Sequence, residues 1–191
     1  MARWDPGTEE RLTKAALELY GEHGYDNVTV TQIAERAGIT RRSYFRYFPD
    51  KREVLFAGSE RLPVAVAEAV LAADVTAAPL PAVLDAVGKV GGQLVELIEG
   101  SGARRAVIES SVELQERERT KFAAVTTAIR DALQQRGVEP QQARLVAQIA
   151  VVVFQNAFDQ WLDGGGKHDF GSCLDEVSAS LRATVAGPRR R

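Results

Sequence analysis

Cysteine is nearly absent from this 191-residue chain, and long uncharged runs are missing altogether. The single cysteine, Cys173, excludes an intramolecular disulfide framework and a multi-cysteine metal site, which suits a reducing compartment. No uncharged run approaches the roughly 18 residues that suggest a membrane helix, and the first residues lack the apolar stretch of a signal peptide. We therefore expect a cytoplasmic protein that does not enter a membrane.

The composition fits neither a disordered nor a fibrous chain. Hydrophobic residues make up 45% and charged residues 26%, both near the globular average. The formal net charge of -2 argues against a surface that is basic throughout. Basic residues are nevertheless concentrated between Thr40 and Arg52, where five of them accompany one acid and give a local net charge of +4. The sequence thus predicts an ordinary globular protein with one locally basic segment.

A first helix is predicted near the N-terminus, where apolar residues recur three and four positions apart. They are Leu12, Ala15, Ala16, Leu19 and Tyr20. A second helix is predicted to begin after Thr29, whose hydroxyl is placed to cap it while Gln32 completes a capping box. Gly38 follows this short helix, and glycine readily adopts the left-handed conformation that ends a helix.

A third helix is predicted from Arg41 to Phe48, with Thr40 as its cap. Its helical wheel places Tyr44 and Phe48 on an inner face. The outer face carries hydrogen-bonding and cationic side chains, namely Arg42, Ser43, Arg46 and Tyr47. A longer helix is then predicted through Lys51, Val54, Leu55 and Leu62, and Pro63 is expected to kink or break it.

Helical patterns also cover the rest of the chain, over 64–74, 80–99, 103–115, 117–136, 140–163 and 170–186, and no convincing strand pattern occurs. The predicted fold class is therefore all-α, with an N-terminal three-helix helix-turn-helix DNA-binding domain and a C-terminal helical ligand-binding and dimerisation domain. We place the first domain at 1–53 and the second at 54–186, followed by a solvated basic tail at 187–191.

Two short helices joined by a glycine-containing turn, the second with an outward row of polar and cationic side chains, are the arrangement of helix-turn-helix DNA recognition. A helix fits the major groove, arginine can bond two acceptors of guanine, and lysine adds charge opposite the phosphates. The alternative is a solvated helical face, which is what most charged stripes are. The wheel alone leaves both interpretations open.

Residues 29–51, TVTQIAERAGITRRSYFRYFPDK, resemble the DNA-binding signature of the TetR family of bacterial transcriptional regulators, and the likeness extends from about Glu9 to Leu55. The resemblance implies a DNA-facing set of Thr31, Arg41, Arg42, Ser43, Phe45, Arg46, Tyr47 and Lys51. It implies a small core of Ile33, Ala34, Ala37, Tyr44 and Phe48. The family often has a small residue at the position of Arg42 and a Leu-Tyr pair at Tyr44 and Phe45, so the operator sequence does not carry over.

In that family the fourth helix links the DNA-binding domain to a ligand-binding domain, and the last two helices pair across a homodimer. The resemblance thus implies a repressor that binds a near-palindromic operator as a homodimer and is released by a small, mostly hydrophobic effector. Activation, and constitutive DNA binding without an effector, stay open. No enzyme is predicted, because the only candidate nucleophile, Cys173, has only His168 nearby and no orienting partner. The spacing of these two residues gives poor support for a metal site, so neither a metal nor a cofactor is predicted.

The C-terminal helices offer less specific signals. The helix over 140–163 has more apolar surface than one stripe needs, which favours a dimer interface, with the domain's own core as the alternative. The interface residues predicted are Phe158, Trp161, Leu174 and Leu181. An effector pocket is predicted from Arg104, Glu109, Phe122, Val125, Phe154 and Gln155. Each of the polar members alone fits an ordinary helix surface equally well.

Overall fold

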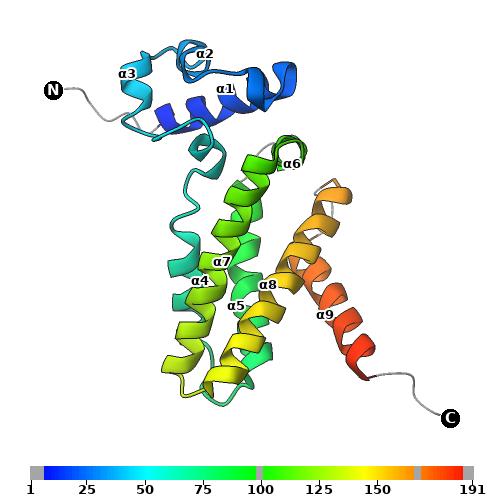
Figure 1. Ribbon diagram of the computed structural model, residues 1–191. Coiled ribbons are helices and arrows are strands. Elements are labelled where there is room, and N and C mark those ends of the chain that lie inside the picture. Colours follow the sequence, from blue (N-terminus) through cyan, green and yellow to red (C-terminus); the bar gives the residue numbers. More distant parts are fainter. Residues whose placement is uncertain (1–6, 98–100, 166–168, 187–191) are drawn as a thin grey trace. The chain divides into compact units, whose positions relative to one another are not determined.

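The computed structural model describes residues 7–97, 101–165 and 169–186, which form α-helices and two short 3-10 helices without a strand (Figure 1). The predicted all-α class is confirmed. The chain divides into two compact units, which we call the N-terminal unit (Met1–Glu60 and Gly100–Thr120) and the C-terminal unit (Arg61–Glu99 and Lys121–Arg191). No described helix is long and apolar enough to span a bilayer. The predicted basic tail at 187–191 lies outside the described residues.

Short helices around one core make up the N-terminal unit. In chain order they are α1 (Gly7–His23), η1 (Tyr25–Asn27), α2 (Val30–Arg36), α3 (Arg41–Tyr44), η2 (Glu53–Phe56), α6 (Ser101–Glu109) and the first part of α7 (Val112–Gln135). The apolar stripe predicted for α1 is buried. The predicted inner residues Ile33, Ala34, Ala37, Tyr44 and Phe48 are buried as well. Helical periodicity therefore located this core correctly.

Longer helices build the C-terminal unit. They are α4 (Leu62–Leu71), α5 (Pro79–Leu97), the remainder of α7, α8 (Pro140–Asp163) and α9 (Phe170–Ala186). α8 packs against both α5 and α9. The bounds of α8 and α9 are those predicted, because Pro140 suits the first turn of a helix and the glycines after Asp163 end one.

The helix predicted through Lys51 and Leu62 is not formed, and α3 is shorter than predicted. After Tyr44 the backbone bonds tighten to three-residue spacing, and η2 is a single turn. Gly58 then has a φ of +74°, a left-handed conformation that ends the turn, and α4 begins only at Leu62. Pro63 lies in the first turn of α4, where its missing N–H is not needed, so it starts a helix and does not break one.

The helix predicted over 103–115 is also wrong, since it is divided between α6 and α7. The Ser110 hydroxyl donates to the carbonyl of Val107 at 2.7 Å. Such a bond from a serine side chain to the backbone competes with continuation of the helix. The Ser111 carbonyl then accepts from the amide of Gln115 at 3.0 Å, as the first bond of α7. The two helices therefore meet at a serine pair that the apolar pattern did not reveal.

Close packing of α5 against α8 and α9 depends on glycine. A Cβ at Gly91 would lie 2.4 Å from Cε1 of Phe170 and 2.8 Å from Cε2 of Phe154. A Cβ at Gly88 would lie 2.9 Å from Cδ2 of Leu174. Glycine inside a helix costs about 1 kcal/mol relative to alanine. At Gly91 this cost is offset by aromatic rings that pack directly on the helix backbone.

Candidate functional site

Caps on both helices fix the helix-turn-helix segment. The Thr29 hydroxyl accepts from the Gln32 amide at 3.3 Å, and the Gln32 side-chain oxygen accepts from the Thr29 amide at 2.8 Å, which is the predicted capping box. Gly38, at φ +73°, then turns the chain. The Thr40 hydroxyl caps α3 by accepting from the amide of Ser43 at 3.1 Å. Local sequence therefore determines where α3 begins.

Two tyrosines fix the inner side of α3 to the loop that follows it. Tyr44 is fully buried, and its hydroxyl donates to the carbonyl of Asp50 at 2.9 Å. Tyr20, on α1, donates to the carbonyl of Lys51 at 2.6 Å. Burial raises the pKa of both phenols far above the ordinary value, so both remain neutral donors. With its inner side held in this way, α3 presents its other side outward.

The outward side of α3 and of the turn after it is exposed and cationic. Arg41, Arg42 and Arg46 are exposed, and Phe45 keeps 46% of its surface accessible although it is aromatic. The guanidinium carbon of Arg41 lies 5.4 Å from the centre of the Phe45 ring. The other residues predicted to face DNA beside them are Thr31, which is exposed, and Ser43 and Tyr47, which are half-buried.

Among the described residues, Arg42 and Arg46 have no partner, in contrast to Arg36 and Arg52. Arg36 pairs with Glu22 at 3.1 Å, and Arg52 pairs with Asp50 at 2.8 Å. Within the described part of the chain, the side chains of Arg42 and Arg46 make no hydrogen bond and no ion pair. An unpaired guanidinium keeps all five of its N–H donors for an external acceptor. This pair of cations on a fixed helix face therefore suits an anionic partner.

Lys51 has a different environment from these arginines. Its ammonium donates to the carbonyls of Tyr25 at 2.8 Å, Val28 at 3.1 Å and Asp26 at 3.4 Å, and it lies 4.2 Å from the centre of the Tyr25 ring. An ammonium has three donors, so these carbonyls use all of them. The structure places Lys51 as a clamp between two loops. The phosphate contact predicted for it stays a prediction, and such a contact would compete with these bonds.

Ion pairs also hold the loop after α3. Asp50 accepts from the backbone amide and from the guanidinium of Arg52, each at 2.8 Å. Burial alone would raise the pKa of Asp50, but these hydrogen bonds hold it below its usual range. Nε of Arg52 also lies 3.3 Å from a carboxylate oxygen of Glu113 on α7, and the hydroxyl of Tyr25 donates to that carboxylate at 3.2 Å.

Residues 101–120 complete the N-terminal unit, a connection that the sequence analysis missed. The guanidinium groups of Arg104 and Arg117 lie 5.1 and 4.9 Å from the ring centre of the buried Phe56. Arg104 donates to the carbonyl of Leu55 at 2.7 Å, and burial lowers its pKa. Arg117 pairs with both carboxylate oxygens of Glu53, at 2.6 and 2.8 Å. No local signal could have revealed these contacts, because their partners are 49 and 64 residues away in sequence.

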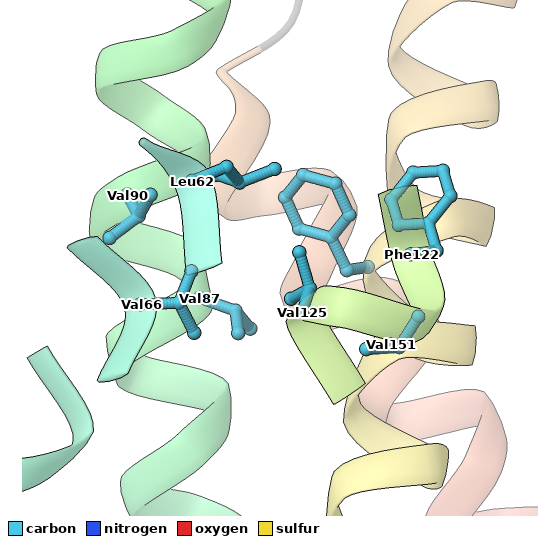
Figure 2. A pocket seen from close by; sticks show the side chains of 8 residues that line it. Leu62, Val66, Val87, Val90, Phe122, Val125 and Val151 are labelled. Atoms are coloured by element: carbon cyan, nitrogen blue, oxygen red, sulfur yellow. The ribbon is translucent and has the colours of Figure 1, made fainter. Parts of the chain in front are cut away.

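The C-terminal unit contains a small apolar cavity between α4, α5, α7 and α8 (Figure 2). Its empty volume is about 290 Å³, which includes its open mouth, and its enclosed part has room for about one water molecule. Figure 2 shows Val66 and Val87 directed toward Val125. The lining residues are Leu62, Val66, Val87, Val90, Phe122, Val125, Val151 and Phe154.

Three of the residues predicted to form an effector pocket line this cavity, namely Phe122, Val125 and Phe154. The three polar ones do not. Arg104 and Glu109 belong to the N-terminal unit, where Glu109 pairs with Arg105 at 2.7 Å. Gln155 follows Phe154 on α8 but points elsewhere, because adjacent helix positions differ by about 100°. The cavity is thus wholly apolar, in contrast to the mixed lining predicted.

The residues predicted for a dimer interface pack within the C-terminal unit itself. Trp161 and Leu174 are buried in its core, and Phe158 and Leu181 are half-buried against that core. The same two helices also carry exposed apolar residues: Leu145 and Val152 on α8, both 56% accessible, and Val185 on α9, 78% accessible. An interface on α8 and α9 stays a prediction, and these exposed residues are the ones it would cover.

Comparison with known proteins matches the helix-turn-helix segment to one family. The sequence pattern of the family described as "Bacterial regulatory proteins, tetR family" matches residues 12–57. The HTH-type transcriptional regulator TcmR of Streptomyces glaucescens is 45% identical over 47 residues, which cover 25% of this chain and 21% of TcmR. The match therefore spans less than a quarter of the length of such curated relatives.

Solved structures resemble the chain over most of its length. The complex of SmeT, from Stenotrophomonas maltophilia, with triclosan has a TM-score of 0.58 at 20% identity and covers 91% of both chains. The complex of FadR from Bacillus subtilis with stearoyl-CoA has a TM-score of 0.60 at 20% identity and covers 88% of this chain and 94% of FadR. At these identities the likeness shows the fold. Residues 12–57 therefore carry the sequence pattern of the TetR family of bacterial regulatory proteins, and the chain as a whole shares the fold of these solved structures.

Proposed function

We propose that this protein is a transcriptional repressor that binds a near-palindromic operator as a homodimer and is released by a small-molecule effector. The observation that carries the DNA-binding part is the pair of unpartnered guanidinium groups, Arg42 and Arg46, on the exposed face of a capped helix. A helix face that only contacts water does not need unpaired arginines, and the charges of Arg36 and Arg52 are paired within the chain.

In the proposed complex α3 enters the major groove. Arg42 and Arg46 donate to guanine edges or to phosphates, and Arg41 stays over Phe45 beside the backbone. The remaining contacts are assigned to Thr31, Ser43 and Tyr47. Lys51, which is bonded to loop carbonyls, positions the helix from behind.

Dimerisation is proposed through α8 and α9. Two recognition helices reach successive major grooves only when they lie roughly 34–36 Å apart, so a dimer with a fixed interface would set the spacing of the half-sites. Leu145, Val152 and Val185 supply exposed apolar surface on these helices. An interface of standard size buries about 800 Å² on each partner.

The effector is proposed to bind at the apolar cavity. Phe122 and Val125 of α7 line it, while Glu113 and Arg117, earlier in the same helix, bond to Arg52 and Glu53 in the segment that follows α3. A ligand that shifts α7 would therefore disturb the loop behind the DNA-facing helix. A 100-fold loss of operator affinity requires about 2.7 kcal/mol of differential binding between the two states. The triclosan and stearoyl-CoA complexes show that structural neighbours take up small molecules with apolar parts.

A selection experiment tests the proposal. Duplexes that the full-length chain retains from a random pool are expected to share a near-palindrome, and the retarded complex is expected to contain two chains for each duplex. A promoter overlapped by the selected site should then lose expression when the chain is present. Retention of duplexes without any common sequence would contradict the proposal, and increased expression would contradict repression alone.

A further inference from the structure

All aromatic side chains of the C-terminal unit's described residues form a single connected cluster. They are Phe122, Phe154, Phe158, Trp161 and Phe170. Ring centres are 6.4 Å apart for Phe122 and Phe154, 5.5 Å for Phe154 and Phe170, and 5.7 Å for Phe158 and Trp161. The rings of Phe154 and Phe158, one helical turn apart, are parallel within 8°. The other buried core residues of this unit are valine, alanine, leucine, isoleucine and cysteine.

This aromatic cluster forms one side of the cavity. Phe122 and Phe154 line it, and Phe154 also packs on the bare backbone at Gly91. Phe158 is half-buried, so the cluster reaches from the cavity to the surface of the unit. Aromatic rings pair with one another more favourably than their buried area alone predicts. The cluster therefore offers flat π faces to whatever occupies the cavity.

The aliphatic part of the cavity lining is stiff. Five of the lining residues are valines, whose side chains are branched at Cβ and have few rotamers. Leu62 is the one aliphatic lining residue that is not branched at Cβ. The described residues contain no methionine, the side chain that most readily adapts its shape to different ligands. A lining of flat rings and stiff valines fits a flat, rigid molecule better than a flexible chain.

The lining also selects against charge. All eight lining side chains are hydrocarbons, so an ion in the cavity would lose its hydration without gaining a hydrogen bond or a counter-charge from them. The ammonium of Lys121 lies 4.3 Å from the centre of the Phe122 ring, but Lys121 does not line the cavity. An uncharged molecule avoids this cost.

We propose that the cavity binds an uncharged, planar aromatic molecule, stacked against Phe122 and Phe154, and that the effector belongs to this chemical class. The class of effector rests on the proposed function, whereas the binding itself does not. Because the enclosed part has room for only about one water, the rings must separate to admit the ligand.

The test uses N-phenyl-1-naphthylamine, an uncharged aromatic dye that accepts excitation energy from tryptophan. The chain has two tryptophans, so a full-length Trp4→Phe variant leaves Trp161, within the cluster, as the only donor. We expect saturable binding that quenches Trp161 emission. The anionic analogue 8-anilinonaphthalene-1-sulfonate should bind at least 10-fold more weakly, and 1-dodecanol, an uncharged aliphatic molecule, should not displace the dye.

Variants locate the bound dye. Phe122→Leu and Phe154→Leu keep apolar bulk but remove a ring face, and each should weaken dye binding about 2- to 10-fold, the value of one aromatic pair. Phe45→Leu, at an exposed ring of the N-terminal unit, is the matched control and should leave dye affinity unchanged. Circular dichroism checks that each variant is folded, and Phe158→Leu provides a second, less buried position in case one of the others is not.

The outcomes separate this inference from the proposed function. Displacement by 1-dodecanol, tighter binding of the anionic dye, or unchanged affinity in the Phe122→Leu and Phe154→Leu variants would each overturn the inference while leaving an effector site possible. Absence of any dye binding would overturn the inference, whereas the proposed function is decided separately by the operator selection. Dye binding at the cluster that leaves operator affinity unchanged would uphold the site and refute its proposed regulatory role.

Discussion

Lys51 offers a prediction in which the structure and the sequence pattern lead to different results. Replacing it with methionine keeps the length of the side chain but removes the donors to the carbonyls of Tyr25, Asp26 and Val28. A hydrogen bond from a charged donor contributes about 1.5–3 kcal/mol, and this side chain is half-buried, so water replaces part of the loss. We expect the N-terminal unit to lose about 1–3 kcal/mol of stability.

Fluorescence in urea can measure this change for the N-terminal unit alone. All four tyrosines of the chain lie in that unit, and a Trp4→Phe background leaves Trp161 to report on the C-terminal unit. With a urea m-value of about 2 kcal/mol/M, the tyrosine transition should move down by about 0.5–1.5 M while the Trp161 transition stays in place. Lys14→Met, at an exposed lysine of α1, is the matched control for the loss of charge.

DNA binding distinguishes the clamp from a phosphate contact. If Lys51 is a clamp, Lys51→Met weakens binding to all duplexes but leaves the slope of log affinity against log salt unchanged. If Lys51 contacts a phosphate, the slope falls by about one ion. An unchanged tyrosine transition together with a reduced slope would refute the clamp.

Three further predictions concern other parts of the molecule. Arg42→Ala should cost about 1–3 kcal/mol at the selected operator and reduce discrimination among its variants, as measured by fluorescence anisotropy; equal losses on specific and random duplexes would reassign Arg42 to the backbone. Val152→Asp should produce a folded monomer by light scattering, because it puts a charge on exposed apolar surface of α8; a dimer of unchanged affinity would place the interface elsewhere. Gly91→Ala should lower the free energy of unfolding obtained from the Trp161 urea transition by about 1–3 kcal/mol, because its Cβ would meet two aromatic rings, whereas Gly92→Ala, with nothing within 4 Å, should raise that free energy; equal effects would contradict the close packing.

Local signals predicted the helix-turn-helix accurately because its determinants are local. Thr29, Gln32, Gly38 and Thr40 act within a few residues of one another, and each has the predicted role in the structure. The helical wheel likewise identified the inner residue Tyr44. The same wheel showed that Arg42 faces outward, but a wheel does not reveal whether a charge is paired.

Long-range contacts account for what the sequence could not show. The bonds from Arg104 to Leu55 and from Arg117 to Glu53 join segments with no shared pattern, so the sequence could not show that residues 101–120 pack with the N-terminal unit. The clamp at Lys51 depends on carbonyl oxygens, which every residue has and no sequence pattern marks. The cavity was found only through its apolar members, since a polar residue beside an apolar stretch gives no information about which helix it faces.

The most direct test of the account is the ratio of two dissociation constants at physiological salt, one for the selected near-palindromic duplex and one for the same duplex with its sequence scrambled. A specific regulator typically binds its own site at least about 10³-fold more tightly than random DNA. We expect a ratio of this size, and we expect it to collapse when Arg42 and Arg46 are both replaced by alanine. A ratio near one for the unmodified chain would contradict it.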